Sequence, residues 1–64
     1  MPNRKLKAMR YLSGMSQDEL ASLVKISQAK ISRIELGYIR PSTEDKEKIA
    51  EALKISSEEL FPEV

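Results

Sequence analysis

Apolar residues recur every three or four positions along most of the chain, which is the spacing of the buried stripe of an amphipathic helix. Four stretches show this pattern, with apolar positions at Leu6, Met9 and Leu12, at Leu20, Leu23 and Val24, at Ile31 and Ile34, and at Ile49, Ala50, Ala52 and Leu53. No stretch alternates apolar and polar residues as a half-buried strand does. The pattern therefore predicts an all-α chain, a compact array of helices without linkers.

Capping residues stand where these helices are expected to begin and end. Asn3 can cap a first helix that runs to about Ser13 and stops at Gly14, where a left-handed conformation is easy. Ser16 and Glu19 are spaced as in a capping box, in which each side chain accepts a hydrogen bond from the other residue's backbone N–H. The second helix is therefore expected to begin directly after Ser16.

The connection between the second and third stretches is unusually short. Ser27 is an N-cap only three residues after Val24, so Lys25 and Ile26 can form only a tight turn between two helices. Gly37 ends the helix that follows the turn. Two capped helices joined by so short a turn pack at a steep angle, and this corner is typical of a helix-turn-helix.

The helix after the corner has two unlike faces. Ile31 and Ile34 form an apolar stripe, and Glu35 lies beside them as a carboxylate that needs a partner. The opposite face carries short or hydrogen-bonding side chains, namely Gln28, Ala29, Ser32 and Arg33. Gln bonds bidentately to adenine, Arg to guanine, and Ala or Ser leaves room for a thymine methyl group. We expect this face to read bases in a DNA groove; a solvated helix face is the alternative, and the preceding corner argues against it.

Arg10 is the expected partner of Glu35. On the first predicted helix it follows Leu6 by four residues and Met9 by one, which places it near the buried side. A bidentate pair between Arg10 and Glu35 would hold the first helix against the third.

The last third of the chain is expected to be structural. Pro41 prevents a helix until Ser42 or Thr43 caps the next one. Ser56 or Ser57 then opens a last short helical turn. The apolar residues at this end either close the core or form a patch for a second copy of the chain, and they are Leu60, Phe61 and Val64.

The composition lacks most of the residue types on which catalytic sites depend. The 64 residues suit one domain, residues 1–64, and they include no cysteine and no histidine. A zinc site, a thiolate and the usual general base are therefore missing, and the serines are accounted for as helix caps. We expect no enzymatic activity, no metal and no cofactor. No apolar run approaches the ~20 residues that span a bilayer, so we expect a soluble, cytoplasmic protein.

Charge is divided unevenly between the two parts of the chain. Residues 1–40 hold eight Lys or Arg and three Asp or Glu, a net charge of +5, whereas residues 41–64 hold three and seven, a net charge of −4. A basic side attracts phosphates, which favours docking of the N-terminal part on DNA. Solvated helix faces with accidental clustering are the alternative interpretation.

Together these motifs resemble the phage repressor and Cro type of helix-turn-helix proteins, often called XRE-like. The likeness runs from about Leu6 to Phe61, and its segments are Ser16-Gln17-Asp18-Glu19-Leu20-Ala21, Ile26-Ser27-Gln28, Ile31-Ser32-Arg33-Ile34-Glu35-Leu36-Gly37, Arg40-Pro41-Ser42 and Ile49-Ala50-Glu51-Ala52-Leu53. The resemblance implies a five-helix, lambda-repressor-like domain with a recognition helix at about residues 28–36. It also implies a homodimer on a roughly palindromic operator and a role in transcription, usually repression.

The resemblance further implies roles for single residues. Family members often hold an Arg and Glu bridge that matches the pair described above, and the base-facing residues are the same four. The expected phosphate contacts are Gln17, Ser27, Lys30, Tyr38 and Arg40.

Two positions depart from the family pattern. Lys25 and Lys54 stand where glycine is common at the ends of the second and fourth helices. A left-handed lysine costs about 1 kcal/mol relative to glycine. The departures concern turn geometry and stability, and they leave the recognition helix unchanged.

Several functional alternatives stay open. Within the DNA-binding class the subtype can be a prophage repressor, a restriction-modification controller or a DNA-binding antitoxin. A different class is a protein-interaction module that keeps the fold but uses its helices or residues 60–64 to bind another protein. Salt separates the two classes, since DNA binding releases counterions and weakens steeply with ionic strength.

Overall fold

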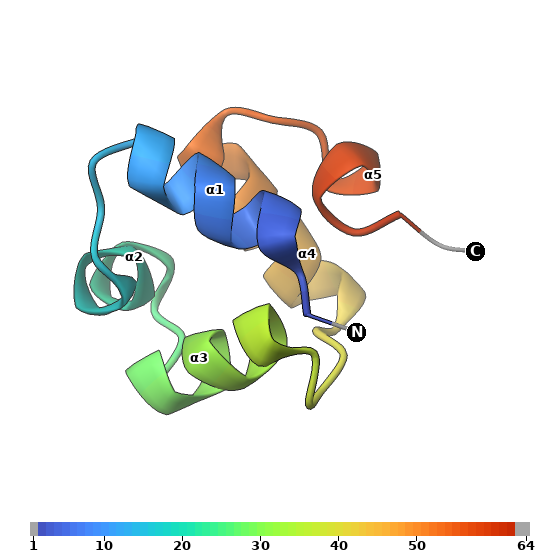
Figure 1. The fold of residues 1–64 in the computed structure, drawn as a ribbon, viewed down its shortest axis with the longest axis horizontal. Helices are drawn as coiled ribbons and strands as arrows, with labels where there is room; N and C mark the ends of the chain where they lie inside the picture. Colours follow the sequence, from blue (N-terminus) through green and yellow to red (C-terminus); the bar gives the residue numbers. More distant parts are fainter. Residues whose placement is uncertain (1, 63–64) are drawn as a thin grey trace.

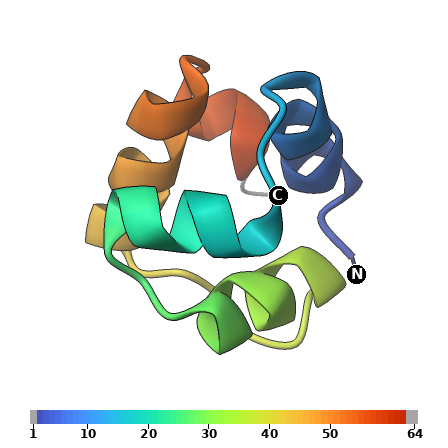
Figure 2. The same ribbon diagram turned by 90° about the vertical axis from the view of Figure 1, so that its left-hand side faces the viewer.

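The computed structural model describes residues 2–62 and consists of helices joined by short turns. The five helices are α1 (Arg4–Leu12), α2 (Gln17–Val24), α3 (Gln28–Leu36), α4 (Thr43–Leu53) and α5 (Ser57–Leu60). No strand occurs among the described residues, so the predicted all-α, five-helix class is confirmed. In Figures 1 and 2, α3 lies at the lower edge of the molecule, below α2.

Each helix begins at a side-chain cap. The Asn3 side chain accepts a hydrogen bond from the Leu6 N–H at 3.0 Å, as expected for α1. Four serines cap the other helices by accepting from the N–H three residues later at 3.1–3.2 Å, and these are Ser16, Ser27, Ser42 and Ser56. Thus Ser42 and Ser56, rather than the neighbouring Thr43 and Ser57, are the caps. These bonds satisfy backbone donors that have no partner within the helix.

The capping box of α2 is complete. The Ser16 N–H donates to Glu19 Oε1 at 2.9 Å, and the Glu19 N–H donates to the Ser16 hydroxyl at 3.1 Å. These hydrogen bonds from Ser16 lower the pKa of the exposed Glu19 carboxyl.

Left-handed residues lie at or just after the ends of α1 to α4. The φ angles of Gly14 and Gly37 are 73° and 81°, and those of Lys25 and Lys54 are 59° and 57°. Lysine therefore adopts the conformation for which the family commonly uses glycine. The two turns thus have the left-handed geometry, and each lysine carries the strain that this conformation causes in a residue with a side chain.

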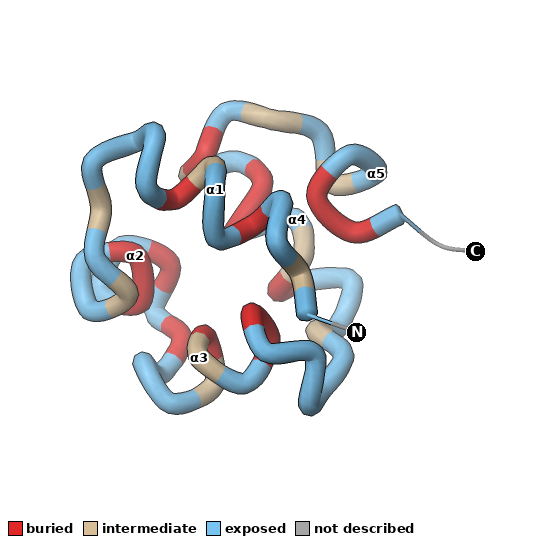
Figure 3. Tube along the Cα trace, viewed as in Figure 1, coloured by how far each residue is buried: buried red, intermediate tan, exposed pale blue. Residues whose placement is uncertain are grey.

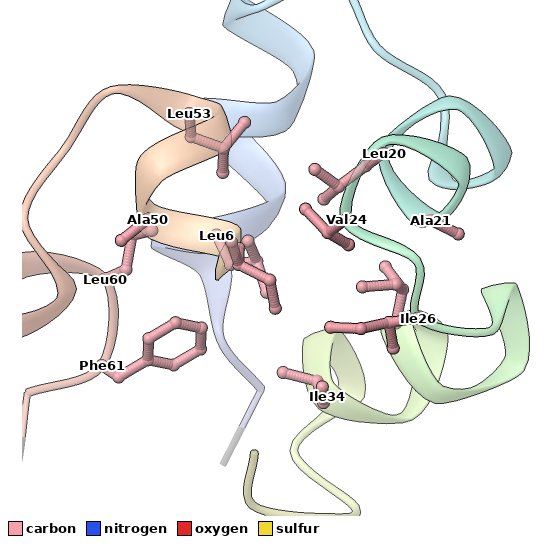
Figure 4. Packing of buried hydrophobic residues seen from close by; sticks show 12 residues of the cluster. Leu6, Leu20, Ala21, Val24, Ile26, Ile34, Ala50, Leu53, Leu60 and Phe61 are labelled. Carbon is pink, nitrogen blue, oxygen red and sulfur yellow. The ribbon is translucent and has the colours of Figure 1, made fainter. Parts of the chain in front are cut away.

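One hydrophobic core lies between all five helices (Figures 3 and 4). α2 packs against both α3 and α4, and α5 packs against α4. The core residues are Leu6, Leu20, Ala21, Val24, Ile26, Ile31, Ile34, Ile49, Ala50, Leu53, Leu60 and Phe61. None of the described helices is long and apolar enough to cross a membrane.

Two residues expected in the core are exposed. Leu12 is 79% exposed and Leu23 is 59% exposed, so both predictions were wrong. On α1 the inward position beside Leu6 belongs to Arg10, and on α2 the stripe is completed by Ala21. Helical spacing allows either choice, and the neighbouring helices decide which side of the stripe they cover.

The end of the chain closes the core. Leu60 and Phe61 are buried, and Figure 4 shows the Phe61 ring turned toward the interior. The two residues cannot at the same time form a free patch for a second copy, so that expected dimer contact is corrected. Val64, the third residue of the expected contact, lies outside the described residues.

Candidate nucleic-acid interface

The corner between α2 and α3 is held by both backbone and side-chain contacts. Lys25 adopts a left-handed conformation, and the Ile26 N–H donates to the Ala21 carbonyl at 3.1 Å. The Ile26 side chain is buried in the core, and Ser27 caps α3. The turn therefore fixes where α3 begins and which way it leaves α2, which is what a helix-turn-helix requires.

α3 buries one face and exposes the other, as predicted. Ile31 and Ile34 lie in the core. On the other face Gln28, Ala29 and Arg33 are exposed and Ser32 is partly exposed, so the four expected base-reading residues share the outward face.

Arg33 is available to a ligand. Within residues 2–62 its guanidinium has no ion pair and no hydrogen bond to the protein. A free guanidinium on an exposed helix face can donate two parallel hydrogen bonds to a guanine edge. The structure therefore leaves this side chain free for the role that the sequence suggests.

Arg10 and Glu35 form the predicted bridge between α1 and α3. Arg10 Nε donates to Glu35 Oε2 at 2.7 Å, and Arg10 Nη2 donates to Glu35 Oε1 at 3.2 Å. Their side chains are only 5% and 4% exposed. The hydrogen bonds to the Glu35 carboxylate raise the pKa of Arg10, whereas burial acts in the opposite direction. Arg10 Nη1 also donates to the Met15 carbonyl at 2.9 Å, which ties the α1–α2 loop to the same pair.

A chain of hydrogen bonds joins this buried pair to the outward face of α3. Gln17 Nε2 donates to Glu35 Oε1 at 3.1 Å, and Gln28 Nε2 donates to Gln17 Oε1 at 2.8 Å. The Gln28 amide is thereby oriented by a residue at the start of α2. One N–H and the carbonyl lone pairs of Gln28 stay available, which is the donor and acceptor set that pairs with adenine.

Sequence reasoning missed the contact between Gln17 and Gln28. Each is the first residue of its helix. Their contact depends on how steeply the corner brings α2 onto α3. The only sequence signal is that each amide directly follows a serine cap.

The residues expected to contact phosphates differ in their exposure and in their partners within the protein. Tyr38 and Arg40 are exposed in the loop after α3, and Gln17 is partly buried by the hydrogen bonds just described. The Ser27 hydroxyl accepts the Lys30 N–H at 3.2 Å, which leaves its own O–H free to donate. Lys30 Nζ lies 2.8 Å from Asp45 Oδ2 on α4, an ion pair that the sequence did not indicate.

A shallow hollow lies at the start of α2. It is lined by residues of α1, of the α1–α2 loop and of the first turns of α2 and α3, including Lys7, Tyr11, Gly14, Gln17 and Gln28. Arg10 and Asp18 also line the hollow, which therefore holds groups of both charges beside a phenol and two amides.

Comparison with solved structures identifies a close likeness. The structure is similar to the high-resolution crystal structure of the restriction-modification controller protein C.AhdI from Aeromonas hydrophila, with a TM-score of 0.86 and 32% sequence identity. The likeness covers 92% of this chain and 89% of that chain. A search of curated protein sequences gave no match.

A protein-family model, that of the helix-turn-helix, matches residues 6–60. The match covers the corner and all the helices packed around it, and its range agrees with the likeness inferred from the sequence motifs. Residues 6–60 make up most of the chain, and the solved relative shares both the fold and a third of the sequence. The chain therefore belongs to the XRE-like helix-turn-helix family of DNA-binding transcription regulators.

Proposed function

We propose that the protein is a sequence-specific repressor that binds a roughly palindromic operator as a homodimer, with α3 in the major groove. One observation carries the proposal. The outward face of α3 presents Gln28, Ala29 and Arg33, while its inward face is fixed to the core through Glu35. A rigid, partly polar helix face of this kind fits the major groove.

Each of the four residues on the outward face of α3 has a proposed role in reading bases. Arg33 donates to guanine, and Gln28 pairs with adenine in the orientation that Gln17 imposes. Ala29 and Ser32 are short enough to let the helix approach closely and to contact a thymine methyl group.

Phosphate contacts position the helix in the groove. The proposed set comprises Gln17, Ser27, Lys30, Tyr38 and Arg40. The net charge of +5 on residues 1–40 supports docking by this side. Of these residues, Lys30 already pairs with a carboxylate of the protein.

The proposed mechanism is occupancy of the operator. Two recognition helices of a symmetric dimer enter successive major grooves with centres about 34 Å apart. A bound dimer then blocks access of polymerase to the promoter. A cytoplasmic location is expected for a protein whose ligand is DNA.

The likeness to C.AhdI favours one subtype. Since C.AhdI is a restriction-modification controller protein and shares 32% of its sequence with this chain, we rank a controller role above the prophage repressor and the antitoxin. In that role the operator would lie next to restriction-modification genes.

Selection of tight binders from a pool of randomised duplexes tests the proposal. We expect an inverted repeat to emerge, since each protomer of a symmetric dimer reads one half-site. The measurement is repeated across ionic strength, where counterion release requires affinity to fall steeply. Recovery of no shared sequence, or salt-independent binding to a protein partner instead, would contradict the proposal.

A further inference from the structure

An ion pair joins the recognition helix to the helix that follows it. Lys30 Nζ on α3 lies 2.8 Å from Asp45 Oδ2 on α4. The Lys30 side chain is 44% exposed, whereas the Asp45 side chain is 11% exposed. The pair therefore lies at the border between the protein interior and the surface that we propose for DNA.

The Asp45 carboxylate depends on Lys30. Its Oδ2 is buried and makes no hydrogen bond of good geometry within residues 2–62, so the nearby ammonium is the charge that neutralises it. A buried carboxylate without a partner is strongly unfavourable. If Lys30 pairs with another anion instead, the Asp45 carboxylate is left buried without a partner, which costs free energy.

A second pair on α4 provides a contrast. Lys48 Nζ and Glu44 Oε1 are 3.3 Å apart, and both side chains are well exposed. An exposed pair four residues apart on one helix contributes little and is easily exchanged for water. The two lysines are equally exposed, at 44%, so the pairs differ in the carboxylate: the Asp45 side chain is 11% exposed, whereas the Glu44 side chain is 76% exposed.

We infer that Asp45 competes with DNA phosphates for Lys30 and thereby limits the sequence-independent part of the affinity for DNA. The inference rests on the proposed function, which places the Lys30 side of α3 next to the DNA backbone. The base-facing residues form no ion pair with Asp45, so the competition affects phosphate binding and not base reading. Asp45 acts through Lys30 and is a positioning residue.

The test is the salt dependence of DNA binding by Asp45→Asn. Affinity for a random-sequence duplex of about 20 base pairs, enough for two half-sites one turn apart, is measured by fluorescence anisotropy over a range of salt concentrations. Release of one lysine to a phosphate makes the slope of log K against log salt steeper by about 0.9 per protomer. The affinity at about 0.1 M salt then rises roughly five- to tenfold for each protomer bound.

Two variants separate the ion pair from net charge. Glu44→Gln removes the same charge from the adjacent, exposed position and is expected to leave the slope unchanged. Adding Lys30→Gln to Asp45→Asn removes the released cation, so the slope is expected to return to the wild-type value. Thermal unfolding of each variant checks that it is folded.

The outcomes are distinct. A wild-type slope for Asp45→Asn, or an equal steepening in Glu44→Gln, overturns the inference. If Asp45→Asn does not fold, Asp45→Ser takes its place in the same measurement, and a wild-type slope for that variant overturns the inference. Wild-type protein that binds the duplex without salt dependence contradicts the proposed function instead.

Discussion

The corner between α2 and α3 and the corner between α4 and α5 are built from the same three residues in the same order. The first is Lys25-Ile26-Ser27 and the second is Lys54-Ile55-Ser56. Both lysines are left-handed, with φ angles of 59° and 57°. Both serines accept from the N–H three residues later at 3.2 Å. The local conformation is thus repeated.

The backbone hydrogen bond that closes the end of the preceding helix repeats as well. The Ile26 N–H donates to the Ala21 carbonyl and the Ile55 N–H donates to the Ala50 carbonyl, each at 3.1 Å. Both alanines are buried, which lets the next helix approach closely. A short sequence is therefore sufficient to specify the corner at either place.

The helices that follow the two corners differ. α3 has nine residues and keeps an exposed face with Gln28 and Arg33, whereas α5 has four residues and ends in the buried Leu60 and Phe61. The first corner therefore presents a helix to solvent and the second folds a helix onto the core. The corner sets the path of the chain, and the side chains of the helix that follows decide whether that helix is presented to solvent or packs on the core.

Loss of the Arg10–Glu35 bridge between α1 and α3 is expected to have the largest effect. Arg10→Met leaves the Glu35 carboxylate buried without its cation, which should lower the free energy of unfolding by about 3–5 kcal/mol. Urea denaturation measures the change. A variant that also carries Glu35→Leu removes the stranded charge and should recover much of the loss. An unchanged midpoint for Arg10→Met would show that the bridge does not hold α1 to α3.

Truncation of a side chain of α5 tests the role of that helix as part of the core. Leu60→Ala should cost about 2–5 kcal/mol, because the side chain is fully buried. Leu23→Ala is the matched control on the helix before the first corner, where the same truncation at an exposed site should cost less than about 0.5 kcal/mol. Equal costs in thermal unfolding would show that α5 is not an essential part of the core.

Removal of the Arg33 guanidinium tests whether α3 reads bases. Arg33→Ala should cost about 1–3 kcal/mol of binding at one base position of a selected operator. Lys54→Ala, which removes one cation at the other corner, should cost no discrimination there. Gel-shift titrations against the operator and a random duplex measure both. Equal losses by Arg33→Ala on the two duplexes would remove its assignment as a base reader.

Glycine at the left-handed positions tests whether the two corners are equivalent. Lys25→Gly and Lys54→Gly should each raise stability by up to about 1 kcal/mol, because glycine adopts positive φ without strain. The gain should be similar at both corners in thermal unfolding. Changes of opposite sign would mean that tertiary contacts, and not the shared local sequence, set the conformation of one of them.

Much of the fold could be predicted from the sequence because caps and turns act over three or four residues. Ser16 and Ser27 mark helix starts through bonds to nearby N–H groups, and Gly37 marks an end. The Arg10–Glu35 bridge could also be predicted, since a carboxylate on a buried stripe needs a cation and one arginine lay on another buried stripe.

Other features depend on how the helices pack. Periodicity assigned Leu12 and Leu23 to the core, yet the neighbouring helices cover the adjacent side of each stripe and leave both exposed. Periodicity also could not decide whether Leu60 and Phe61 close the core or form a surface patch. Their burial follows from the angle at which the second corner directs α5 back onto the core.

The sequence by itself determined the helices, the corners and the residues that α3 can offer to a ligand, because these depend on contacts between near neighbours. Only the tertiary structure decided which polar groups work together. Gln17 meets Gln28 and Lys30 meets Asp45 because the packing of consecutive helices brings side chains of different helices within hydrogen-bond or ion-pair reach. Such contacts depend on the angle and rotation of whole helices, which no local pattern specifies.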